Sequence, residues 1–237
     1  MLTPALRFDT VDLFLRSDAK ALHEWVTRSR SRLVWFCIAA IVVGSGLYGA
    51  AMGSWRDGWQ ALYNAIKLPL VILLTALGNG LLNGMLAPLL GLNLGFRQSL
   101  VLVLISFALA SLILGALSPV ALFVVWNTPP LIASSRLWSL EYGFLQLTLA
   151  VFIAFAGILG NVRLLPLLRQ WTNKPAVARK VLFAWLAGNL FLGSQLAWIL
   201  RPFIGAPNLP VEFLRATAFH GNFYETIFHA ARRLVVP

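Results

Sequence analysis

Five apolar segments dominate this sequence, and each has about the length that a helix needs to cross a lipid bilayer. They fall at about residues 33–53, 68–92, 99–125, 142–161 and 181–200. A transmembrane helix needs roughly 20 mainly apolar residues. Only 11% of all residues are charged, whereas soluble domains have about a quarter. The pattern therefore predicts an all-α, polytopic membrane helix bundle with five transmembrane helices.

Polar segments flank the five spans and divide the chain into three parts. Residues 1–32 combine six basic residues with apolar residues at helical spacing, which predicts a retained amphipathic helix at the membrane interface. A cleaved signal peptide fits less well because this charged region and the apolar run after it are both too long. Residues 33–200 form the five-helix domain. Residues 201–237 begin with a proline-rich loop and end in a second predicted amphipathic helix that contains Phe219 and Phe223.

The distribution of basic residues predicts the orientation of the chain. Twelve of the 19 Lys and Arg residues lie in segments 1–32, 92–98 and 162–180. Because cytoplasmic loops are enriched in Lys and Arg, the N-terminus is predicted to be cytoplasmic and the C-terminus extracytoplasmic, in a bacterial inner (cytoplasmic) membrane. The net charge of +11 then reflects loops that meet anionic lipid, and we expect no nucleic-acid partner.

Aromatic and basic residues near the span ends are expected to anchor the protein at the bilayer surface. Trp55, Trp59 and Tyr63 recur at intervals of four, which predicts a short helix that lies in the headgroup layer. Trp25 would serve the same role in the N-terminal segment. Arg201 directly follows the last span, and its side chain is expected to extend toward the headgroups.

Small residues and amides interrupt the apolar spans at helical spacing. The small residues of the second span, together with a proline, share one face, and two amides lie on the adjacent face. In lipid, small residues allow close helix packing and amides form interhelical hydrogen bonds. The residues of these patterns are Ala76, Gly80, Gly84 and Pro88, with Asn79 and Asn83 beside them, and Ser45, Gly49 and Gly53 in the first span.

The amides have two interpretations. They either hold helices together or line an uncharged polar path, to which Asn189 and Gln195 of the fifth span would contribute. Under the first interpretation, the second and fifth spans pack on each other through their amide and glycine faces.

The spans contain no ionisable residue that could carry membrane chemistry. All acidic residues and histidines fall outside them. Such residues at membrane depth usually mark proton relays or catalytic sites. Although Ser45 lies between glycines as in a rhomboid-like protease, no span offers the histidine base. We therefore expect no enzyme activity, metal or cofactor.

One weaker alternative is a lipid-modifying enzyme or cation site outside the spans. It would be built by convergence of Asp57, Glu141, Glu212, Glu225, His220 and His229.

The chain resembles the Yip family in its overall plan. The shared features are five spans, a polar N-terminal segment, a glycine-rich second span and a third span that carries Ser118 and Pro119. The resemblance covers about residues 33–200 and implies a five-helix integral-membrane domain, whose role is mostly unassigned in bacterial members.

These patterns favour a non-enzymatic subunit or scaffold of a membrane complex. Its expected partners are the lipid bilayer and other membrane-protein subunits or further copies of itself. The alternative is an oligomeric channel or transporter whose path is lined by Asn79, Asn83, Asn189 and Gln195.

Overall fold

The computed structural model describes residues 30–92, 94–129, 138–172, 174–204 and 210–225. All regular secondary structure in these ranges is helical. The predicted all-α class is therefore confirmed. The helices are α3 (Arg30–Gly53), α4 (Gly58–Leu89), α5 (Phe96–Trp126), α6 (Trp138–Val162), α7 (Leu165–Arg169) and α8 (Pro175–Leu200).

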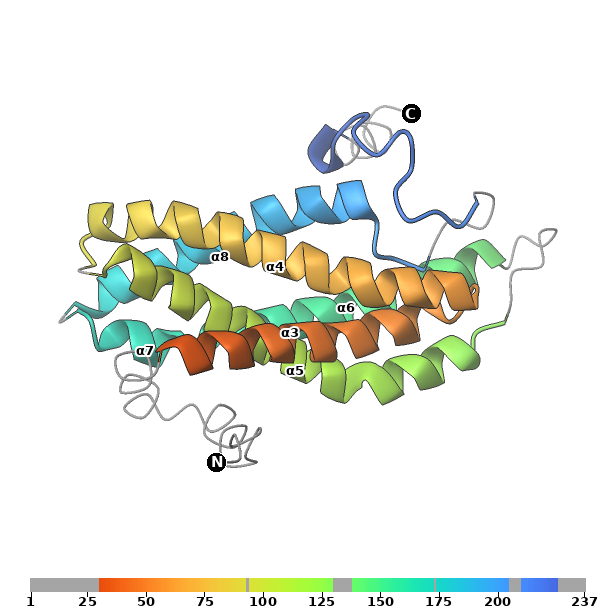
Figure 1. Ribbon diagram of the computed structural model, residues 1–237, viewed down its shortest axis with the longest axis horizontal. Helices are drawn as coiled ribbons and strands as arrows, with labels where there is room; N and C mark the ends of the chain where they lie inside the picture. Colours follow the sequence, from red (N-terminus) through yellow and green to blue (C-terminus); the bar gives the residue numbers. More distant parts are fainter. Residues whose placement is uncertain (1–29, 93, 130–137, 173, 205–209, 226–237) are drawn as a thin grey trace.

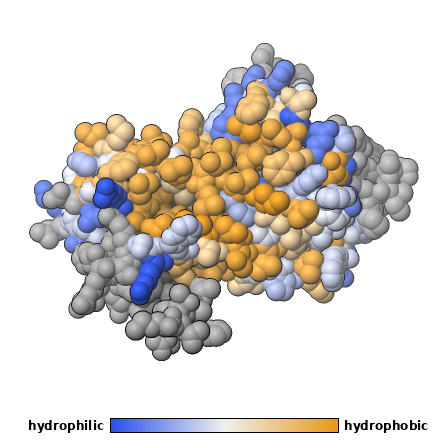
Figure 2. Space-filling view, viewed as in Figure 1, coloured by the Kyte–Doolittle hydropathy of each residue, from blue (hydrophilic) through white to orange (hydrophobic). Residues whose placement is uncertain are grey.

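Five of these helices are long and apolar enough to cross a membrane, and they correspond to the five predicted spans. The chain is thus a multi-pass membrane protein. Figure 2 shows the apolar surface as a broad band across the molecule, with hydrophilic residues gathered toward its two ends. This is the distribution expected for a bundle whose middle faces hydrocarbon and whose ends face water.

The bundle is built around α5, which packs against α3, α4 and α6. On the side away from α3, α8 lies along α4 (Figure 1), and it has little direct contact with α6. The described C-terminal segment, residues 201–204 and 210–225, folds back over the ends of α4 and α8 (Figure 1). A space bounded by α4, α5, α6 and α8 therefore remains under this segment.

Glycines allow α3 to approach two neighbours at backbone distance. A Cβ atom on Gly44 would overlap the Ser111 carbonyl of α5, and one on Gly115 would lie 3.0 Å from the Gly44 Cα. Farther along α3, a Cβ on Gly49 would overlap the Asn64 carbonyl of α4, and one on Gly53 would lie 2.5 Å from the Gln60 carbonyl. Small residues at such crossings allow the close van der Waals contact that holds helices together in lipid.

The expected separate surface helix at residues 54–67 is absent, and that prediction was wrong. The helix α4 begins at Gly58 and continues without interruption to Leu89. Its first turns do carry exposed Trp59, but Gln60 and Lys67 on a neighbouring face of the helix are buried. The polar face of this stretch is therefore turned into the protein, where carbonyl groups of the C-terminal segment accept its hydrogen bonds.

The turn between α4 and α5 explains why these two helices form a close antiparallel pair. Gly91 has a φ of +85°, which L-residues with a side chain rarely adopt. The N–H of Leu92 donates to the Ala87 carbonyl and that of Gly91 to the Pro88 carbonyl. These two backbone hydrogen bonds form the Schellman motif, which ends a helix and reverses the chain.

The predicted N-terminal amphipathic helix, including Trp25, lies outside the described residues. Of the predicted C-terminal helix, residues 223–225 are helical, whereas Phe219 lies in a turn before them; the remainder, with His229, also lies outside the described residues. The side chain of Glu141 is not described.

Candidate functional site

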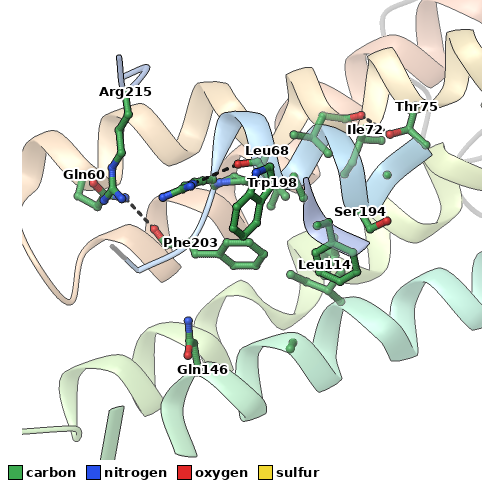
Figure 3. Close-up of a pocket in the computed structure, with 18 of the residues that line it drawn as sticks. Gln60, Leu68, Ile72, Thr75, Leu114, Gln146, Ser194, Trp198, Phe203 and Arg215 are labelled. Atoms are coloured by element: carbon green, nitrogen blue, oxygen red, sulfur yellow. Dashed lines mark hydrogen bonds between the residues drawn. The ribbon is translucent and has the colours of Figure 1, made fainter. Parts of the chain in front are cut away.

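A cavity of about 620 Å³ lies among α4, α5, α6, α8 and the C-terminal segment. We call it the α4–α8 cavity. Along α4 its lining runs from Gln60 to Thr75, which corresponds to about 22 Å at the helical rise of 1.5 Å per residue. Figure 3 shows Arg215 and Gln60 at one end, and Thr75 and Ser194 toward the other. The cavity is therefore elongated, and it follows the direction in which the helices cross the membrane.

The middle of the α4–α8 cavity is apolar. Every helix that borders it contributes aliphatic or aromatic side chains. These are Leu68, Val71 and Ile72 of α4, Phe107 and Leu114 of α5, Ala150 and Ile153 of α6, and Ala197 and Trp198 of α8. Such a wall offers dispersion contacts and no hydrogen bonds, so it suits a hydrocarbon chain.

One end of the cavity, which we call the arginine end, is strongly polar. It is lined by Arg56, Gln60, Arg201, Glu212 and Arg215. The lining thus includes three arginines and one glutamate, so its formal charge is positive. Arginine presents several N–H donors in a planar fork that matches carboxylate and phosphate groups.

Arg201 reaches the cavity because the chain turns sharply at the end of α8. It adopts φ 46° and ψ 59°, and its N–H donates to the Ala197 carbonyl. The side chain then lies over the Trp198 ring, with Cζ 4.6 Å from the ring centre, and its Nε donates to the Trp198 carbonyl at 3.2 Å. Partial burial and the nearby Arg215 lower the pKa of Arg201 below its usual range. Arg201 therefore lines a cavity. From the sequence, its side chain was expected to extend toward the headgroups instead.

The C-terminal segment is held over the cavity by polar groups of α4. Gln60 Nε2 and Asn64 Nδ2 donate to the Phe203 carbonyl at 2.7 and 2.9 Å. Lys67 Nζ donates to the Glu212 carbonyl at 3.0 Å and lies 5.3 Å from the centre of the Phe213 ring. These bonds satisfy buried polar groups that would otherwise be costly in a membrane protein.

We expect Lys67→Met to loosen the C-terminal segment. A hydrogen bond from a charged donor contributes about 1.5–3 kcal/mol, so its loss should raise proteolytic cleavage of this segment roughly tenfold. The measurement is limited proteolysis in detergent, with mass spectrometry of the fragments. Lys180→Met is the matched control, since Lys180 is exposed at the far end of α8. Equal cleavage of both variants would show that Lys67 does not anchor the segment.

Three amides form a hydrogen-bonded chain near the other end of the cavity, in which Asn79 and Asn161 are buried and Asn189 is half-buried. Asn79 Nδ2 of α4 donates to Asn189 Oδ1 and, at 3.2 Å, to the Trp185 carbonyl, both on α8. Asn189 Nδ2 donates to Asn161 Oδ1 of α6 at 3.2 Å. A Cβ on Gly188 would overlap Asn79 Oδ1, so this glycine leaves room for the amide. The expected packing of the second span on the fifth is therefore present, and Asn161 extends the amide contacts to a third helix.

Two further amides do not join this group. Asn83 is fully buried and, among the described residues, has no hydrogen-bond partner. Gln195 instead accepts a hydrogen bond from the Phe223 N–H of the C-terminal segment at 3.3 Å. Asn83 and Gln195 therefore do not meet, and of the four amides expected to line a path only Asn189 lines the cavity.

Two glycines of the second span, Gly80 and Gly84, face a different helix from the one expected. A Cβ on Gly80 would overlap Leu100 of α5, and one on Gly84 would overlap Phe96 of α5. These glycines therefore accept side chains of α5 and do not form the contact with α8. Because the amides and glycines are one residue apart, the helix directs them to different neighbours. Ser45 is buried, and its Oγ donates to the Ile41 carbonyl at 2.5 Å.

Within the described ranges, no group of three His, Cys, Asp or Glu side chains is placed to hold a metal ion. No family model, curated protein or solved structure matches the chain. The arrangement of the residues themselves thus supplies the argument for function.

Three residues of the site were not predicted from the sequence, namely Gln60, Asn161 and Arg215. Arg215 lies in the proline-rich tail, far along the chain from the helices it approaches. Gln60 and Asn161 lie at the ends of spans, where polar residues are common. Their interruption of a strongly apolar pattern is the one signal that could have identified them.

Proposed function

We propose that this protein is a non-enzymatic membrane protein that holds a lipid-like amphiphile in the α4–α8 cavity. The observation that carries the proposal is the shape and polarity of this cavity, which has an apolar middle and a cationic end. Its volume of about 620 Å³ lies within the range of about 300–1,000 Å³ typical of small-molecule sites.

The membrane setting explains why an amphiphile fits better than a water-soluble molecule. A soluble polar ligand would leave the apolar wall without partners, whereas a hydrocarbon chain fills it. A fully apolar ligand would leave the guanidinium groups without acceptors. A molecule with a chain and a polar head satisfies both parts of the cavity at once.

Filling the cavity should displace the bound amphiphile. We expect Ala197→Phe, which adds a ring to the cavity wall, to reduce co-purified lipid at least about tenfold, since overpacking costs roughly 1–3 kcal/mol. Native mass spectrometry of the protein in mild detergent measures the retained lipid. Ala187→Phe is the matched control because Ala187 lies on the same helix and is exposed. Lipid retention that is unaffected by Ala197→Phe, or absent in the unaltered protein, would refute the proposal.

A polar path for ions or solutes has less support. Asn79 and Asn83 are fully buried, and Asn79, Asn189 and Asn161 bond to one another across three helices. Amides that bond to one another hold helices together, and they leave few donors or acceptors for a permeating molecule.

The proposal includes the setting that the sequence predicts. The excess of basic residues in segments 1–32 and 162–180 supports a cytoplasmic N-terminus in a bacterial inner membrane. The arginine end of the cavity would then lie on the extracytoplasmic side. A role as a subunit or scaffold, with other membrane proteins or with copies of itself, and a relationship to the Yip family remain predictions. Purification in mild detergent followed by mass analysis of co-purifying chains tests the subunit role.

A further inference from the structure

Arg201 and Arg215 form a pair of like charges at the arginine end of the α4–α8 cavity. Both side chains line the cavity, and they come from the turn after α8 and from the C-terminal segment. Their mutual repulsion contributes to the lowered pKa of Arg201. Two guanidinium groups in one partly buried site repel each other, and an anion bound between them offsets this repulsion.

The described part of the chain provides no such anion. Among these residues, neither Arg201 nor Arg215 forms an ion pair with a carboxylate. Glu212 also lines the cavity, but its backbone carbonyl is the group engaged, by Lys67 Nζ. The donors of Arg201 are only partly used, because Nε bonds to the Trp198 carbonyl while Cζ stacks on the indole ring. This stacking fixes the direction of the guanidinium group and leaves its terminal nitrogens available.

The position of this pair relative to the apolar wall specifies the kind of anion. Trp198 lies between the arginine pair and the apolar wall, since it lines the cavity and the face of its ring contacts Arg201. On one side of it, Leu68 and Ile72 continue the wall toward the amide end (Figure 3). An anion bound by the two arginines would therefore be adjacent to an apolar slot, as the phosphate of a membrane lipid is adjacent to its acyl chain.

We infer that Arg201 and Arg215 bind the headgroup phosphate of a lipid with net negative charge, with an acyl chain along the apolar wall. This inference rests on the proposed function, and it adds the chemical class of the ligand. The C-terminal segment contributes Arg215, so it acts as part of the headgroup site as well as the cover of the cavity. Guanidinium pairs bind phosphate through charge-assisted and often bidentate hydrogen bonds.

The test compares two lipids that share acyl chains and differ in net charge. The full chain is delipidated in detergent and titrated with phosphatidylglycerol or phosphatidylcholine, and bound lipid is counted by native mass spectrometry. We expect the unaltered protein to prefer phosphatidylglycerol by about tenfold or more. The double variant Arg201→Gln/Arg215→Gln should bind the two lipids about equally. Arg179→Gln/Lys180→Gln, which removes the same charge from exposed positions on α8, should retain the preference.

A single variant keeps the test decisive if the double variant does not fold. Arg215 lies in the C-terminal segment outside the helices, so we expect Arg215→Gln to preserve the bundle and to weaken phosphatidylglycerol binding by about tenfold. Thermal unfolding in the same detergent checks that the fold is retained.

The other outcomes separate this inference from the proposed function. Equal binding of both lipids, blocked by Ala197→Phe, would overturn the headgroup assignment and leave the cavity as a lipid site. Loss of the preference in the α8 control would also overturn it, by showing that only net charge matters. Full competition by inorganic phosphate would indicate a site for small anions. No lipid binding in any variant would refute the proposed function as well.

Discussion

Gly44→Val should destabilise this protein more than any other substitution we propose, by about 3 kcal/mol or more, which is the upper part of the range for overpacked cores. The reason is the contact between α3 and α5, where a Cβ on Gly44 would overlap the Ser111 carbonyl. A backbone carbonyl cannot move without its helix, so α3 and α5 would have to separate. Their separation would also disrupt buried contacts of Cys37 and Ile41 along the same interface.

Gly157→Val on α6 is the matched control for this prediction. No atom lies within 4 Å of the position that its Cβ would occupy. Both variants introduce the same β-branched residue into a long helix, so they share its small cost in helix propensity. We expect a large fall in Tm and in the yield of monodisperse protein for Gly44→Val alone. Similar Tm values for the two variants would disprove the close approach of α3 and α5.

Asn79→Leu is expected to cost about 2 kcal/mol. Interhelical amide bonds in membrane proteins contribute about 0.6 kcal/mol on average and up to about 1.7, and Asn79 Nδ2 makes two, to Asn189 and to the Trp185 carbonyl. The leucine methyl groups would in addition approach the backbone of Gly188, against which Asn79 Oδ1 lies. Reversible unfolding in mixed micelles measures the change in the free energy of unfolding.

Asn83, four residues after Asn79 on the same helix, provides the comparison for this prediction. Asn83 is as buried as Asn79, but it has no hydrogen-bond partner among the described residues. A buried amide without a partner is unfavourable, so replacing it by leucine of similar size should be neutral or stabilising. A loss of stability in Asn83→Leu as large as that in Asn79→Leu would show that burial, and not the amide chain, decides the effect.

The fold class and the five spans could be predicted from the sequence because they depend on short-range properties. A run of about 20 apolar residues enters a bilayer wherever it lies in a chain, and in hydrocarbon it must form a helix to satisfy its backbone. The error at residues 54–67 has a complementary cause. Their spacing predicted a helix, which the structure has from Gly58 onward, but whether this helix lay flat or formed the start of α4 depended on the partners of Gln60 and Lys67.

The amide and glycine patterns were informative about which residues are buried, and less so about their neighbours. Helical spacing placed Asn79 and Gly80 on adjacent faces of one span. It could not specify that the first faces α8 and the second α5. That choice depends on how the helices are arranged around one another, which is determined by the packing of all of them together.

The sequence alone determined that this chain is an all-helical membrane bundle whose predicted spans contain no acidic residue or histidine, because hydropathy and charge are properties of single segments. Only the tertiary structure decided that a cavity lies between α4 and α8 and that Arg201 and Arg215 both line one end of it. The physical reason is that a cavity arises where helices fail to touch. It therefore depends on the relative positions of five segments and a folded-back tail, which no single segment encodes.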